Sequence, residues 1–195
     1  MKFIKMLWNY LWVELGNATP RLPYIIRIKN LCYKIAGLKF KGKATIWGPI
    51  TVTPYSGIEN IYVGAGTFIN TETRFGVPDK DSPIIIGKEV KVGPRVMFET
   101  INHDLAHDSI LARGAYTKPI TIEDAVWIGA GSTILQGVTI GKGSVIAAGS
   151  IVNKDIPADS LYGGAPARFL RKIEQTEKLP QDRESMVTSL DKATA

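Results

Sequence analysis

The two histidines of the chain, His103 and His107, lie in a segment that also contains Asn102 and Asp104. An imidazole titrates near neutral pH, so it can take a proton from a hydroxyl or an amine and pass it on. His103 stands at the root of the segment, which favours a catalytic role over that of a loop histidine exposed to water. His107 could form a pair of metal ligands with His103. A catalytic zinc site of three histidines within one chain is excluded, and we expect no metal and no catalytic role for His107.

Three cations near the C-terminus are candidates for binding phosphate. If Lys154, Arg168 and Arg171 lie close together they would suit a phosphate-bearing ligand; the alternative is that each is an exposed surface cation. The chain contains no GxxxxGK[ST] loop, no GxGxxG after a strand and no GxSxG motif. Nucleotide hydrolysis, dinucleotide redox chemistry and serine hydrolysis therefore lack their usual signatures.

The elements that must position these residues follow a six-residue repeat. Aliphatic residues recur at Ile122, Ile128, Ile134, Ile140, Ile146 and Val152. A small or branched residue stands four positions after each of them: Val126, Ser132, Val138, Ser144, Ser150 and Ile156. A coil whose flat sides each take six residues would turn both sets inward, because strand side chains alternate. The pattern predicts a solenoid whose core is buried by stacking, rather than a sandwich or barrel with hairpin turns every 8–12 residues.

The repeat is interrupted once. It already runs through Ile86, Val92 and Phe98, but residues 101–119, which hold both histidines, lack it. We expect this segment to protrude as a loop from a regular wall. On the wall itself, Trp127 directly precedes an inward-facing position and should face outward, where a neighbouring subunit or a flat ligand would cover it.

The basic charge of the chain is concentrated at its N-terminus. The 195 residues carry 24 basic and 18 acidic side chains, a net charge of +6, whereas residues 1–43 carry nine basic side chains against Glu14 alone, a net charge of +8. A general nucleic-acid binder would not confine its excess charge in this way, so we expect no nucleic-acid partner. We divide the chain into a basic helical leader (1–43), a repeat domain (44–171) and a polar tail (172–195).

Two apolar stripes predict helices in the leader. The first comprises Ile4, Leu7, Trp8, Leu11, Trp12 and Leu15, and the second comprises Ile25, Ile28, Leu31, Cys32 and Ile35. These helices could fold back and cover the open end of the solenoid, or lie as basic amphipathic helices on an anionic membrane surface. Both interpretations stay open at this point.

The location of the protein is predicted from what the sequence lacks. The sequence contains no run of about 18 uncharged apolar residues, so it predicts no helix that spans a membrane. The N-terminus also has no convincing signal-peptide cleavage site. The single cysteine, Cys32, excludes an intramolecular disulfide framework. We expect a cytoplasmic protein, with peripheral contact to the inner face of the membrane as an option that the basic leader raises.

Three segments together resemble the hexapeptide-repeat acyltransferases, and within them the galactoside and maltose O-acetyltransferases and related polysaccharide O-acetyltransferases. They are residues 120–131 (ITIEDAVWIGAG), 137–157 (GVTIGKGSVIAAGSIVNKDIP) and 163–168 (GGAPAR). The resemblance implies a left-handed parallel β-helix and a homotrimer with acetyl-CoA in clefts between subunits. The fold we expect is this all-β solenoid with an N-terminal helical segment, a protruding loop at about 101–119 and a short C-terminal helix.

The resemblance also implies roles for single residues. His103 matches the catalytic histidine, a general base that deprotonates the acceptor hydroxyl for direct attack on the thioester without a metal. Asn70 matches an active-site asparagine near the acceptor. Asp79 and Asp81 are the candidates for the family's acceptor-site aspartate, on a segment whose length differs from the family's, and Asn102, which flanks His103, is the fourth acceptor-binding candidate. The candidates for binding acetyl-CoA are Trp127 beside the channel, Ala130 and Ala148 along the pantetheine arm, Asn153 and Lys154 near the nucleotide, and Arg168 and Arg171 near the phosphates. Asn153 departs from the threonine that is usual in the family.

We therefore expect an acetyl-CoA-dependent O-acetyltransferase that acts on a saccharide. A polysaccharide, lipopolysaccharide or capsule precursor is favoured over a free disaccharide, because the basic leader could keep the enzyme near membrane-bound intermediates. The family's N-terminal acceptor residues have no counterpart that can be aligned, which argues against simple galactosides and maltose. The alternatives are an amino-sugar N-acetyltransferase, a γ-type carbonic anhydrase with histidines shared between subunits, and a β-helix scaffold without catalysis.

Overall fold

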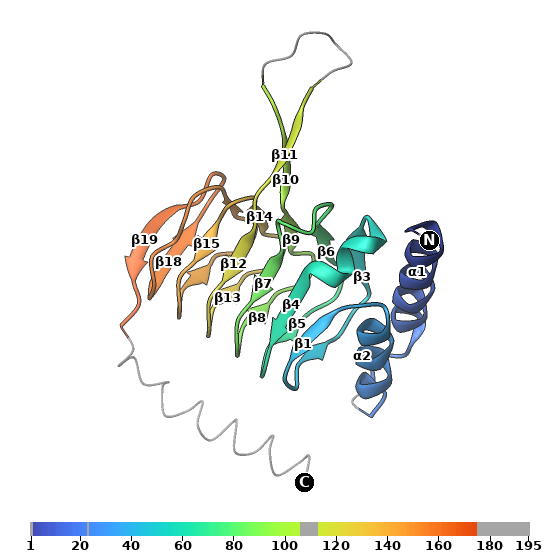
Figure 1. Ribbon diagram of the computed structural model, residues 1–195. Coiled ribbons are helices and arrows are strands. Elements are labelled where there is room, and N and C mark those ends of the chain that lie inside the picture. The colour runs from blue at the N-terminus through green and yellow to red at the C-terminus, as the bar shows by residue number, and fades with distance from the viewer. Residues whose placement is uncertain (1, 23, 106–112, 175–195) are drawn as a thin grey trace, which may run out of the picture.

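The computed structural model describes residues 2–22, 24–105 and 113–174 of the chain. Two helices, α1 (Lys2–Ala18) and α2 (Ile26–Ile35), precede a series of short strands and one 3₁₀ helix, η1 (Tyr55–Asn60). The strands form a stack of coils with the helices at one end and a projecting hairpin near the middle (Figure 1).

Each coil contributes one strand to each of three sheets. Sheet A contains β1 (Lys39–Lys41), β4 (Ile61–Gly64), β7 (Ile84–Ile86), β12 (Ile120–Ile122) and β15 (Thr139–Ile140). Sheet B contains β2 (Thr45–Ile46), β5 (Phe68–Ile69), β8 (Lys91–Val92), β13 (Trp127–Ile128), β16 (Val145–Ile146), β18 (Ser160–Gly163) and β19 (Arg168–Lys172). Sheet C contains β3 (Ile50–Thr53), β6 (Thr73–Gly76), β9 (Met97–Glu99), β14 (Thr133–Leu135) and β17 (Ile151–Val152). Neighbouring coils pair in parallel, so the chain winds as a parallel β-helix.

The core confirms the six-residue repeat. All six repeating aliphatic residues are buried, and the register stacks Ile122 on Ile140, Ile128 on Ile146, and Ile134 on Val152. The residues four positions later are buried as well: Val126, Ser132, Val138, Ser144, Ser150 and Ile156. The serines among them bond to backbone carbonyls of the corners, which satisfies their hydroxyls inside an apolar column.

The interruption of the repeat leaves the wall, as the sequence predicts, and its described ends form a two-stranded hairpin rather than an irregular loop. Strands β10 (Ile101–His103) and β11 (Ala115–Thr117) pair antiparallel and project from the corner between sheets C and A. The wall continues beneath the hairpin, because β9 pairs directly with β14 and β7 with β12. The hairpin is therefore an addition to a complete coil.

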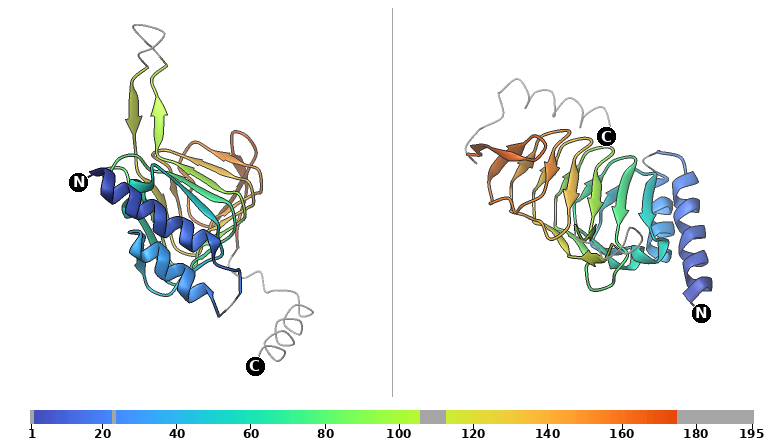
Figure 2. Two further views of the ribbon diagram at one scale, coloured as in Figure 1. Left: turned by 90° about the vertical axis from the view of Figure 1, so that its right-hand side faces the viewer. Right: turned by 90° about the horizontal axis from the view of Figure 1, so that it is seen from above.

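The leader covers the N-terminal end of the solenoid. Val13 of α1 and Tyr33 and Ala36 of α2 belong to the main core cluster, and Asn17 Nδ2 donates to the Ile50 carbonyl at 3.0 Å. Figure 2 shows both helices lying across the first coil. The first strand begins at Lys39, four residues before the boundary that the charge distribution predicts.

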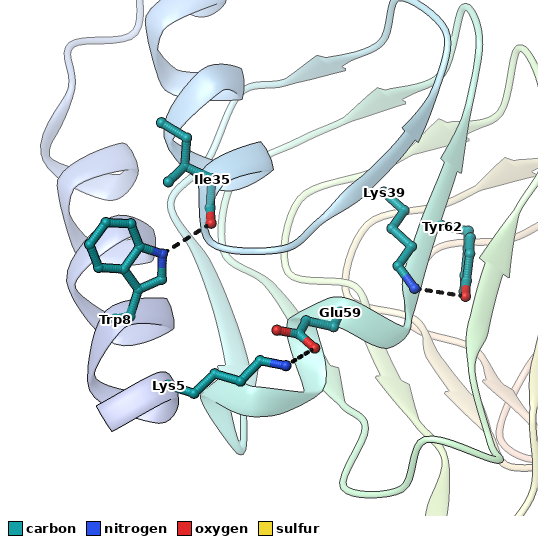
Figure 3. A network of polar contacts seen from close by, with 6 residues as sticks. All are labelled: Lys5, Trp8, Ile35, Lys39, Glu59 and Tyr62. Atoms are coloured by element: carbon teal, nitrogen blue, oxygen red, sulfur yellow. Dashed lines mark hydrogen bonds and ion pairs between the residues drawn. The ribbon is translucent and has the colours of Figure 1, made fainter. Parts of the chain in front are cut away.

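The face through which α1 packs differs from the predicted one. Asn9, Val13 and Gly16 are its buried positions, whereas most of the predicted apolar stripe is exposed. The cause is a close approach of α2: a Cβ on Gly16 would lie 2.7 Å from the Tyr33 ring, so only glycine leaves room for that ring. Polar contacts fix the helices in this orientation (Figure 3): Trp8 Nε1 donates to the Ile35 carbonyl at 3.4 Å, and Lys5 Nζ lies 2.8 Å from Glu59.

The C-terminal end also differs from expectation. The segment from Ser160 to Lys172 forms β18 and β19, which pair antiparallel, where a short helix was expected. The backbone of β18 pairs with β16 and so extends sheet B, and β19 pairs in turn with β18, which holds residues 168–172 in a strand. Residues 175–195, which include most of the predicted tail, lie outside the described residues.

Candidate active site

His103 is the last residue of β10, three residues beyond Thr100, where the hairpin leaves the solenoid. Its side chain is exposed, and its backbone N–H donates to Asn102 Oδ1 at 2.8 Å. This bond fixes the backbone next to the imidazole and leaves the imidazole at the surface, where a substrate can reach it. His107 lies outside the described residues.

Asp79 is tied to the root of the same hairpin. Thr117 Oγ1 donates to Asp79 Oδ2 at 3.0 Å, and the Asp81 backbone N–H donates to Asp79 Oδ1 at 3.0 Å. The bonds from the Asp81 backbone and from Thr117 lower the pKa of the Asp79 carboxyl, which is therefore an anion at neutral pH. Thr117 pairs with Ile101, two residues before His103. The structure thus brings Asp79, Asp81, Asn102 and His103 to one corner of the solenoid.

A second group of candidates lies on sheet B. Trp127 is 56% exposed and is flanked by Lys91 of β8 and Val145 of β16. Ala130 and Ala148 follow β13 and β16 at the corner with sheet C, where the Gly149 N–H donates to the Ala130 carbonyl at 2.8 Å.

The corners at residues 129–132 and 147–150 carry only glycine, alanine and buried serine side chains. A Cβ on Gly129 would lie 2.5 Å from the backbone nitrogen of Ala148. The tight stacking leaves a smooth wall beside the indole, against which a long, thin ligand could lie. Asn70 follows β5 at the same corner, with its Oδ1 accepting from the Thr71 N–H at 2.8 Å.

A third group meets in a groove of about 380 Å³ near the C-terminal end. Asn153, Lys154 and Arg168 line it together with Tyr162 and Phe169. Two cations beside two aromatic rings can hold a phosphate and a flat ring system. Arg171 lies outside this lining, on β19 opposite Leu161 of β18.

One protomer does not bring all candidates together. The hairpin group occupies the corner between sheets C and A, whereas Asn70, Ala130 and Ala148 occupy the corner between sheets B and C. A full side of the coil separates these corners, roughly 10–15 Å at the rise of a strand. A site that used both groups would need the hairpin corner of one copy beside the sheet B corner of another.

Sequence reasoning missed Glu99 and Arg74. Glu99 stands four residues before His103, and one of its carboxylate oxygens lies 3.1 Å from the Arg74 Nε. Burial raises the pKa of the Glu99 carboxyl, and the neighbouring Arg74 guanidinium opposes this shift. The carboxylate lies over Gly76, where a side chain would overlap it. An acidic residue in the wall just before the break in the repeat is the signal that could have revealed this pair.

Known proteins share both the repeat and the fold. The family described as bacterial transferase hexapeptide (six repeats) matches residues 119–154. A galactoside O-acetyltransferase of Lactococcus lactis is 42% identical over 122 residues, which are 62% of this chain and 57% of that protein. The chain spans little more than half the length of such curated relatives.

Solved structures extend the likeness to nearly the whole chain. A hexapeptide-repeat acetyltransferase of Vibrio cholerae superposes with a TM-score of 0.75 at 32% identity, covering 88% of this chain and 92% of that one. The chain belongs to the hexapeptide-repeat acetyltransferases. A galactoside acetyltransferase solved with coenzyme A superposes equally well, with a TM-score of 0.75 at 30% identity over 93% of this chain and 84% of the other.

The described residues contain no group of three or more histidine, cysteine, aspartate or glutamate side chains arranged to hold a metal ion. No helix among them is long and apolar enough to cross a membrane.

Proposed function

We propose that this protein is an acetyl-CoA-dependent O-acetyltransferase that acetylates a hydroxyl group of a saccharide. The observation that carries the proposal is His103 on a hairpin that projects from the solenoid wall, with the Asp79 carboxylate fixed at the hairpin root. The family membership supports the reaction, and relatives named galactoside O-acetyltransferase support a sugar hydroxyl as acceptor.

In this proposal His103 is the general base. Its imidazole takes the proton of the acceptor hydroxyl while the oxygen attacks the thioester carbon; the new C–O bond replaces the C–S bond, and the proton passes to the departing thiolate. Asp79, Asp81, Asn102 and Asn70 bind the hydroxyls of the acceptor. Positioning of the two substrates supplies much of the remaining acceleration.

The residues available to acetyl-CoA fit its parts. The exposed Trp127 ring can cover the thin pantetheine arm, and the small Ala130 and Ala148 leave space for it along the wall. Lys154 and Arg168 in their shared groove, with Asn153, suit the phosphates of the nucleotide end. Arg171, on the neighbouring strand, is proposed to contact the same phosphates from outside the groove.

We further propose a homotrimer with sites between subunits, built on a left-handed β-helix as in the family. Two observations support it: the candidates divide between two corners of one protomer, and Trp127 leaves an indole exposed on a flat wall. A trimer would set the hairpin of one copy against sheet B of the next.

Acetyl-CoA binding tests the proposal without knowledge of the acceptor. We expect calorimetry to give micromolar binding that weakens with dephospho-CoA and with Arg168→Ala, but not with Lys88→Ala on a distant surface. A folded protein that does not bind acetyl-CoA would refute the transferase proposal.

The catalytic role is tested next in an acceptor screen. Replacing a general base typically lowers the rate about 10²–10⁴-fold, so His103→Ala should do so while His107→Ala retains activity. Mild alkali should release the acetyl group from the product as an ester; a product stable to alkali would indicate N-acetylation of an amino sugar.

A further inference from the structure

The helices that cover the solenoid turn an apolar face outward. On α1 the side chains of Ile4, Leu7, Trp8, Leu11 and Leu15 are 45–71% exposed. On α2 the side chains of Ile28 and Leu31 are 55% and 54% exposed. Because the buried positions of α1 are Asn9, Val13 and Gly16, the exposed residues lie on the opposite side of that helix. We call this set of seven residues the cap face.

The two helices that carry the cap face lie against each other. The bond from the Trp8 indole to the Ile35 carbonyl joins the two helices, and Figure 2 shows α1 and α2 side by side at the end of the solenoid. Soluble proteins seldom expose an apolar patch of this extent unless it binds something.

A basic groove borders the cap face. It has a volume of about 520 Å³ and lies between α2 and the first coil. Its apolar lining includes Ile26, Leu31 and Phe40, and its cations are Arg27, Lys34 and Lys43. Leu31 belongs to both the groove and the cap face, so the two adjoin.

Two acidic side chains close to the cap make contacts of their own. Glu14, the sole acidic residue of the first 43, accepts a hydrogen bond from the Tyr55 hydroxyl at 2.9 Å. Glu59 is paired with Lys5. The described residues that line the groove include no acidic side chain. The groove therefore presents uncompensated positive charge next to an apolar surface.

We propose that the cap face and its groove dock this protein on an anionic lipid bilayer. The apolar side chains enter the boundary of the acyl chains, and Arg27, Lys34 and Lys43 hold the phosphate of a lipid headgroup. A second copy of the chain is a poorer occupant, because a symmetric contact would set the same cations of two copies against one another.

Docking on this face would orient the proposed active site. The hairpin leaves the third coil sideways, across the stacking direction (Figure 1). Two coil spacings, roughly 10 Å, separate that coil from the first. The cap helices add the diameter of a helix, roughly 10 Å. His103 would thus stand about 20 Å above the lipid surface, within reach of a long saccharide anchored there. This consequence rests on the proposed function, whereas the docking itself does not.

Vesicle co-sedimentation of the full chain tests the docking. We expect binding to vesicles of phosphatidylcholine and phosphatidylglycerol in equal parts, weakened by added salt, and little binding to phosphatidylcholine alone. Leu7→Glu/Leu11→Glu should reduce the partition coefficient by about tenfold or more, since it removes apolar burial and adds repulsion. Leu7→Met/Leu11→Met is the matched control and should retain binding.

The charge contribution is tested by a second pair. Arg27→Glu/Lys34→Glu should also lower binding by about tenfold or more, whereas Lys88→Glu/Lys142→Glu, with the same change in net charge on the solenoid wall, should not. An equal loss of vesicle binding in both double variants would show a general effect of net charge and would refute the role proposed for the groove. Absence of binding by the unmodified chain would overturn the docking.

Two further readouts separate the outcomes. If Leu7→Glu/Leu11→Glu dissociates an oligomer in analytical ultracentrifugation, the cap face belongs to a second copy and the proposal is wrong. Calorimetry with acetyl-CoA on each variant reports on the proposed function alone, because the cap residues lie outside the candidate active site. Failure of that binding in the unmodified chain would leave the vesicle result standing.

Discussion

Lys29 is a buried side chain whose replacement we expect to strengthen the fold. It lies fully buried on the inner side of α2, and its Nζ has no hydrogen-bond partner within the described part of the chain. Burial lowers the pKa of its ammonium group from 10.5, and repulsion from Arg21 adds to the shift. Lys29→Met keeps an unbranched side chain of similar length and removes the amine.

The expected gain follows from the cost of an unpaired polar group. A buried donor without a partner costs about 1–3 kcal/mol, and Lys29→Met should raise the free energy of unfolding by an amount in that range. For a chain of this size each kcal/mol raises the midpoint of thermal unfolding by about 2–4 °C. The variant should therefore melt several degrees higher at neutral pH.

The gain should depend on pH. Between the lowered pKa of the folded state and 10.5, the unfolded lysine binds a proton that the folded lysine does not. The unmodified protein therefore gains stability as pH rises through this window. Lys29→Met lacks this titration, so the difference between the two proteins should shrink as pH approaches 10.5.

Thermal unfolding followed by circular dichroism, at neutral and at alkaline pH, measures both effects. Lys34→Met is the control, because Lys34 is exposed on the same helix and its replacement should leave the midpoint nearly unchanged. A lower midpoint for Lys29→Met would refute the reasoning, since it would mean that the amine makes a stabilising contact in the folded protein.

Four further replacements test the solenoid. Phe98 is buried and stacks on Phe75 at 5.4 Å between ring centroids, so Phe98→Ala should cost about 3–5 kcal/mol in urea unfolding; a loss below about 1 kcal/mol would contradict a rigid core. Because burial raises the pKa of Glu99, folding stability should fall as pH rises from 4.5 through the pKa of the folded state. Glu99→Gln should abolish this fall in thermal unfolding, and an unchanged pH dependence of the midpoint would show that Glu99 does not cause it. Gly149 has a φ of +71° and open space around it, so Gly149→Ala should cost about 1–2 kcal/mol. Gly129→Ala should cost more, because its Cβ would lie 2.5 Å from the Ala148 nitrogen and force the coils apart; the reverse order would contradict this account.

The solenoid could be predicted because its period is a property of the backbone. Each side of the coil takes six residues, so Ile122, Ile134 and Ile146 lie in three different walls of one core. Three sides complete a turn, which stacks Ile122 on Ile140 in the same column. The break at residues 101–119 was equally informative, since a segment without the period cannot lie in the wall. It holds the hairpin that carries His103.

What the sequence could not predict depends on contacts between distant residues. The period of α1 predicts a helix, but the choice of buried face was decided by Gly16, which admits the ring of Tyr33 from another helix. Glu99 stands out as an acidic residue in the wall, but its partner Arg74 lies on the neighbouring coil, and only the stacking of β6 on β9 brings the two together. For the same reason the groove shared by Lys154 and Arg168 emerges only once β19 folds back on β18.

The neck of the hairpin has a consequence for how such an enzyme can diversify. The Lys118 N–H donates to the Thr100 carbonyl at 2.9 Å, so the chain leaves and re-enters the wall at a single closed point. Insertions, deletions or a transplanted loop beyond this point would leave the stacking of β9 on β14 untouched. Selection can thus remodel what the hairpin reaches while the scaffold keeps its stability, which makes acceptor range and thermal robustness separable traits for evolution and for protein engineering.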